Sequence, residues 1–101
     1  MIADLQKKLE TLNIKTILWG DASPVPWDFQ APCYYRPTNT IHICTWSTPT
    51  VIAHEIGHAM STSDEVTAWL VAIENFGDCK WFDIEYAVEQ LEWHYLKLLG
   101  E

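Results

Sequence analysis

The segment from His54 to His58 reads His-Glu-Ile-Gly-His, an H-E-x-x-H pattern. In an α-helix, residues four positions apart lie on one face, so the imidazoles of His54 and His58 can reach the same metal ion. Paired imidazoles suit zinc, and a catalytic zinc needs three protein ligands with the fourth position left for water. We therefore expect a Zn2+ site at this segment.

Glu55 lies next to the face that carries the two histidines. Zinc lowers the pKa of a bound water from about 16 to about 7 and polarises a carbonyl group. A neighbouring glutamate can take the proton of the attacking water and deliver it to the leaving amine. The pattern predicts peptide-bond hydrolysis with Glu55 as general base. The same sequence pattern has two other interpretations. The histidines could be hydrogen-bonded core residues beside an exposed glutamate, or the segment could form a metal site without peptidase activity.

The third zinc ligand is left open by the spacing. Glu65 begins the next expected helix after a loop of about three residues, so it can lie beside His58. Asp64 stands where an H-E-x-x-H-x-x-G-x-x-H/D pattern places a ligand, although the glycine of that pattern is missing. His42 and His94 are further candidates, and His94 could instead donate a hydrogen bond to a transition-state oxyanion. Of these, Glu65 is preferred.

Helix signals surround the motif. Ser47-Thr48-Pro49 combines a hydroxyl N-cap with proline at the first helical position, which predicts a helix from about 49 to 60. Thr62-x-x-Glu65 fits a capping box that opens a second helix through about Asn75, ended by Gly77. A last helix is predicted by apolar residues at helical spacing, namely Ile84, Val88, Leu91, Tyr95 and Leu98.

The N-terminal half predicts one helix and three strands. Apolar spacing indicates a helix that ends near Asn13. The expected strands and loops are a strand at 15–20, a surface loop at 20–27, and a hairpin of 33–36 and 40–44 around 37–39. In 40–44, Ile41 and Ile43 should face the core and leave Thr40, His42 and Cys44 on a free face. This order predicts an α+β fold, with a small antiparallel sheet of about three strands and the helices packed on one face.

Composition limits the function classes. With 101 residues, 49% of them hydrophobic, the chain fits one domain over residues 1–101. The formal charge is −8, and residues 64–101 carry 9 acidic and 2 basic side chains, so nucleic acid is not expected as a partner. The three cysteines show no C-x-x-C pairing, and we find neither a signal peptide nor an apolar run long enough for a membrane span. These features lead us to expect a cytoplasmic protein, in a bacterial or a host cell.

With these features the sequence resembles a minimal zincin, and it is similar to the small gluzincin-type metallopeptidases of the IrrE/ImmA kind from bacteria and phages. The resemblance covers about residues 33–73 and rests on the strand 40–44, the segment His54–Met60, and Glu65-x-x-Ala68-Trp69-x-Val71-Ala72. The spacing from His58 to Glu65 is shorter than in many members of that family.

The resemblance implies a zincin-like fold and zinc-dependent cleavage of a protein or peptide. His54, His58 and Glu65 would be the ligands, with Glu55 as the base. In such enzymes the strand before the active-site helix receives the substrate as an added strand, and residues 40–44 would do so here. The alternative is a catalytically inactive, zincin-like interaction module that binds a partner through its tryptophan-rich surface and acidic C-terminal part.

Overall fold

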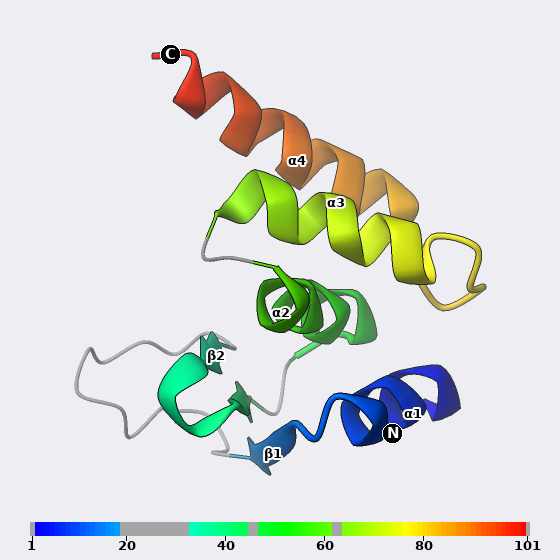
Figure 1. Ribbon diagram of the computed structural model, residues 1–101. Coiled ribbons are helices and arrows are strands. Elements are labelled where there is room, and N and C mark those ends of the chain that lie inside the picture. Colours follow the sequence, from blue (N-terminus) through cyan, green and yellow to red (C-terminus); the bar gives the residue numbers. More distant parts are fainter. Residues whose placement is uncertain (1, 19–32, 45–46, 62–63, 101) are drawn as a thin grey trace.

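The computed structural model describes residues 2–18, 33–44, 47–61 and 64–100. Over these ranges the chain is α+β, as predicted, with four α-helices and a three-stranded sheet (Figure 1). The predicted loop at 20–27 lies outside the described residues. The elements in chain order are α1 (Ala3–Thr11), β1 (Lys15–Leu18), β2 (Cys33–Tyr35), a 3-10 turn (Arg36–Thr38), β3 (Thr40–Ile43), α2 (Pro49–Met60), α3 (Glu65–Phe76) and α4 (Ile84–Leu98).

The sheet is mixed rather than antiparallel. Its strand order is β1-β3-β2. The hairpin of β2 and β3 is confirmed, with Cys33 opposite His42 and Tyr35 opposite Thr40. The pairing of β1 with β3, however, is parallel, so the prediction of an antiparallel sheet was wrong for this pair. Parallel neighbours need a connection of about a dozen residues or more, and residues 19–39 between β1 and β3 are long enough to provide one.

The central position of β3 corrects two expectations about residues 40–44. Both backbone edges of β3 are paired, so this strand cannot take up an added substrate strand. Its expected free face is also wrong, because Thr40, His42 and Cys44 are all buried. The ring of Tyr35 lies edge-on to His42, and the hydroxyl of Thr40 donates to the carbonyl oxygen of Thr38.

The helix that carries the motif begins where the sequence predicts. Thr48 is the N-cap of α2, and its Oγ1 accepts a hydrogen bond from the backbone N–H of Val51. The start of α3 differs from the prediction, because its N-cap is Asp64, whose carboxylate accepts from the N–H of Thr67. The predicted capping residue Thr62 lies outside the described residues. The end of α3, with Gly77 as the C-cap residue, agrees with the prediction.

Three of the helices, α2, α3 and α4, stack outward from the sheet in this order. Figure 1 shows α2 between the sheet and α3, with α4 beyond α3, and the contacts between elements agree with this order. Buried side chains of α1, β3, α2 and α3 form one continuous core, in which Leu5, Ile41 and Ile56 are the largest fully buried residues. None of the helices within the described ranges has the length and apolar character needed to cross a membrane.

Candidate metal centre

Three side chains that could hold a metal ion meet where α2 approaches the start of α3. Nε2 of His58 lies 2.9 Å from Oε1 of Glu65, and Nε2 of His54 lies 3.1 Å from Oε2 of the same carboxylate. One ligand atom from each of the three residues lies within 4.8 Å of the others. Both histidines are buried, whereas the Glu65 side chain is 41% exposed. The cluster is therefore anchored in the core and open on the side of α3.

Gly57 allows α3 to come this close. A Cβ atom on Gly57 would lie 2.2 Å from the backbone oxygen of Ala68, a distance at which one of the two helices would have to move. Ala68 is itself fully buried, and α2 and α3 are the most extensively packed pair of described elements. The glycine inside the motif thus brings the first turn of α3, with Glu65, beside His58.

Two polar contacts hold the C-terminal end of α2. Oγ of Ser61 donates to the carbonyl oxygen of Gly57 at 2.6 Å. Nη2 of Arg36, from the turn between β2 and β3, donates to the carbonyl oxygen of His58 at 2.8 Å. The last carbonyls of a helix lack partners within the helix, so these bonds fix the turn that carries His58. Nothing in the spacing of the sequence pointed to Arg36.

The imidazole of His54 is held by an aromatic stack. The rings of His54 and Trp69 are nearly parallel, with their centroids 4.1 Å apart and an interplanar angle of 8°. Trp69 is buried, and Tyr86 of α4 packs edge-on against it at 5.9 Å. Trp69 therefore has two roles, since it belongs to the core and also forms one wall of the cluster.

The charges in the cluster are strongly coupled. Burial lowers the pKa of His54, but contacts with the carboxylates of Glu55 and Glu65 outweigh burial and raise that pKa to about 9. Contacts with His54 and His58 hold the pKa of Glu65 far below its usual value. Without a metal, the raised pKa of His54 favours a proton on its imidazole, and this positive charge compensates the carboxylate of Glu65 as a bound cation would.

Unsatisfied polar atoms gather at the same place. Although Nε2 of His54 lies close to Glu65, their orientation gives no hydrogen bond. Within the described part of the chain, this nitrogen and Nε1 of the stacked Trp69 are the two buried polar side-chain atoms without a hydrogen-bond partner. Buried polar groups are normally satisfied. A buried nitrogen that has no hydrogen-bond partner and belongs to a group whose ligand atoms lie within 4.8 Å of one another fits a metal ligand. Two imidazoles with one carboxylate form a three-ligand set used by catalytic zinc.

Glu55 is buried on the other side of the His54 ring. Its Oε2 lies 3.3 Å from Nδ1 of His54. The carboxylate also affects β2: burial raises the pKa of the Cys33 thiol, and the charge of Glu55 raises it further. Glu55 thus contacts His54 and acts electrostatically on β2, and α2, which carries Glu55, packs against β2 and β3.

The other candidate ligands are placed differently. Asp64 caps α3 and is bonded to Thr67, so it is used in starting the helix. His42 is buried on β3, away from the cluster, and its burial lowers its pKa. His94 of α4 does reach the cluster, with Nε2 3.5 Å from Oε2 of Glu65. The three residues that the structure groups as able to hold a metal are His54, His58 and Glu65.

Comparisons of the chain with protein-family models, with curated proteins and with solved structures find no significant match. The α+β fold and the site geometry are thus the grounds for a functional assignment.

Proposed function

We propose that the protein is a zinc-dependent metallopeptidase with a minimal, zincin-like fold. The observation that carries this proposal is the convergence of His54, His58 and Glu65 on one point, with the carboxylate of Glu55 in the same helix. Zinc bound there would supply Lewis-acid activation of a water molecule and of the scissile carbonyl.

The protein's own residues supply the remaining chemistry. The contact between Glu55 and Nδ1 of His54 favours the tautomer that carries its proton on Nδ1, which leaves Nε2 free to bind a metal. During hydrolysis Glu55 accepts one proton from the attacking water and passes it to the amine as the C–N bond breaks. The products are a carboxylic acid and an amine, the acid then gives its proton to the amine, and Glu55 ends in its starting state.

The substrate is proposed to be a protein or peptide that adds to β2. This strand lies at an edge of the described sheet and packs against α2. It also contains Cys33, whose pKa is raised by burial and by the charge of Glu55. Among the described elements, the other edge strand, β1, packs chiefly against β3 and less against α2 than β2 does. A photo-crosslinking residue at Tyr35 should capture a bound peptide, whereas one at Ile17 of β1 should not. The reverse result would place the substrate elsewhere.

Zinc content and proteolysis together test the proposed activity. The purified protein should contain one zinc per chain and cleave an unfolded, fluorescently labelled protein. Glu55→Gln should abolish cleavage and keep the zinc, because the amide cannot accept the proton, whereas His54→Ala should lose both. Glu74→Gln removes an exposed carboxylate from α3 and should change neither. Cleavage by Glu55→Gln at the wild-type rate would rule out Glu55 as the base.

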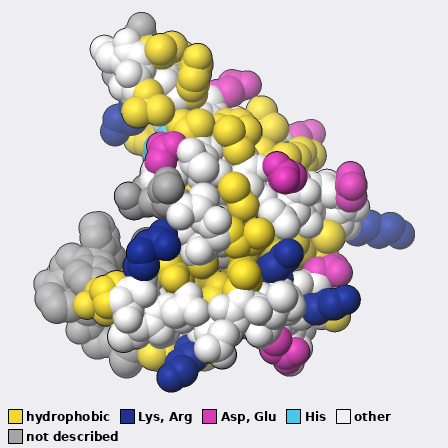
Figure 2. Space-filling view, in the orientation of Figure 1, with side chains coloured by type: hydrophobic (Ala, Val, Ile, Leu, Met, Phe, Trp, Pro, Cys, Tyr) yellow, Lys and Arg dark blue, Asp and Glu magenta, His cyan; other side chains and the backbone are white. Residues whose placement is uncertain are grey.

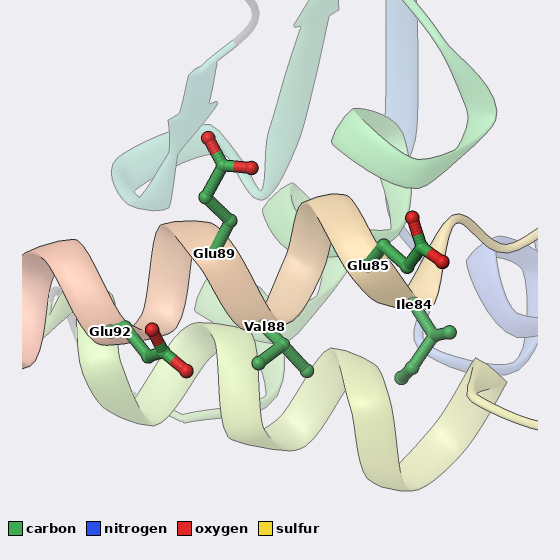
Figure 3. A pocket seen from close by; sticks show the side chains of 5 residues that line it. All are labelled: Ile84, Glu85, Val88, Glu89 and Glu92. Atoms are coloured by element: carbon green, nitrogen blue, oxygen red, sulfur yellow. The ribbon is translucent and has the colours of Figure 1, made fainter.

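A second candidate function, a non-catalytic interaction module, is favoured by the outer face of α4. A shallow hollow there is lined by two aliphatic side chains and three carboxylates: Ile84, Val88, Glu85, Glu89 and Glu92 (Figure 3). Hydrophobic side chains also reach the surface beside acidic ones over α3 and α4 (Figure 2). Such a face would suit a basic amphipathic helix.

A lysine- and leucine-rich helical peptide is the probe for this second function. If α4 is the docking face, the peptide should bind the wild type, and Glu89→Lys should weaken binding because one attraction becomes a repulsion. Equal binding by both proteins would exclude the α4 face as a docking surface.

A further inference from the structure

His94 connects α4 to the candidate metal centre. Its Nε2 lies 3.5 Å from Oε2 of Glu65, and its side chain is 22% exposed. The helix reaches this position because α4 packs on α3, the helix that carries Glu65. The packing of α4 on α3 thus holds this histidine beside the cluster.

Glu65 contacts imidazoles on two sides. From α2, His58 approaches Oε1 and His54 approaches Oε2; from α4, His94 approaches Oε2. The two α2 histidines belong to the metal-capable group and His94 does not. A carboxylate that binds a metal through one oxygen has a second oxygen free to accept a hydrogen bond. His94 is the described side chain from outside α2 that is placed to donate it.

We propose that His94 is a positioning residue that orients Glu65 for metal binding. The inference rests on the proposed function, because it assumes that Glu65 is a zinc ligand. The Glu65 side chain is partly exposed, and a hydrogen bond from α4 would add a restraint on its rotamers to those from the two histidines of α2. Hydrogen bonds to the ligands of a metal commonly change its affinity by about 10- to 100-fold.

The test measures zinc affinity by competition with a chromophoric chelator. His94→Ala should weaken zinc binding by about 10- to 100-fold. His94→Gln should restore most of this loss, because its amide N–H can donate to the same oxygen. Tyr95→Ala, at the exposed neighbouring position of α4, should stay within about twofold of the wild type.

Two further measurements separate positioning from other roles. In a Glu65→Ala background, His94→Ala should cause no additional loss of affinity, because its effect acts through Glu65. The absorption spectrum of the cobalt-substituted protein at saturation should be the same with and without His94. An unchanged zinc affinity in His94→Ala, an equal loss in the Glu65→Ala background, or an altered cobalt spectrum would each overturn the proposal. The last result would make His94 a metal ligand.

The wild-type measurement distinguishes a failure of the proposed function from a failure of the role of His94. If the wild type binds no zinc, the proposed function fails and takes the role of His94 with it. If the wild type binds zinc through His54 and His58 but His94→Ala binds it equally well, only the role of His94 is lost.

Discussion

Alanine in place of Gly57 tests whether the contact between α2 and α3 determines the geometry of the metal site. The added Cβ would lie 2.2 Å from the backbone oxygen of Ala68, whereas real Cβ atoms are essentially never closer than 3.0 Å to such a neighbour. The obstructing atom belongs to the backbone of a helix and cannot rotate away. The two helices must therefore separate by about 1 Å at this point, and overpacking of this kind costs about 1–3 kcal/mol.

The same movement should reach the ligands. Glu65 lies one turn before Ala68, so a shift of about 1 Å in α3 would lengthen the 2.9 Å contact between Glu65 and His58 toward 4 Å. We expect Gly57→Ala to lower the midpoint of thermal unfolding of the metal-free protein by about 5–20 °C. We also expect it to weaken zinc binding.

The control is Leu70→Ala, an exposed position on α3. This variant should leave zinc binding unchanged, because it does not alter the distance between the helices. If Gly57→Ala has the stability and zinc affinity of the wild type, the tight crossing of α2 and α3 does not position Glu65.

Three other perturbations have defined outcomes. Trp69→Ala removes the ring stacked on His54 and should lower the free energy of unfolding, measured in urea, by about 3–5 kcal/mol. Trp69→Phe keeps an aromatic ring at this position and should lower it much less. Equal losses in the two variants would argue against a stabilising stack. Arg36→Met removes the hydrogen bond to the carbonyl oxygen of His58 and should lower the free energy of unfolding by about 1 kcal/mol in the same measurement. An unchanged free energy of unfolding would show that water replaces this bond. In the metal-free protein, the pKa of His54 is raised from 6.5 to about 9, so its contribution to stability is present below pH 6.5 and lost as the pH rises through about 9. Unfolding free energies measured from pH 6 to 10 should fall over this window in the wild type but not in His54→Ala, and parallel curves would refute the coupling.

Local signals explain which parts of the site could be predicted. Thr48 and Pro49 define the start of α2, and the four-residue spacing of His54 and His58 is a property of any helix. The start of α3 was harder to predict from the sequence, because Thr62 and Asp64 lie two positions apart and both are suitable N-cap residues. The structure uses Asp64, whose carboxylate meets the N–H of Thr67.

Non-local contacts explain what could not be predicted. The parallel pairing of β1 with β3 depends on how the chain crosses between them, and this pairing makes β3 a central strand instead of an edge. The approach of His94 to Glu65 depends on the rotation of α4 about its own axis. The apolar spacing that predicts α4 does not mark its buried face, because Ile84, Val88, Tyr95 and Leu98 are exposed whereas Ala87 is buried.

In a chain of this size, the same residues build the core and the candidate site. Gly57 and Ala68 form the closest packing between α2 and α3, and that packing also brings Glu65 to His58. Trp69 fills the core and holds the ring of His54. Because His54 and His58 lie on α2 and Glu65 lies on α3, any ion that binds all three also joins α2 to α3. An excess of zinc at 100 times its Kd would then stabilise the folded state by about 2.7 kcal/mol, so folding and metal binding should be measured together.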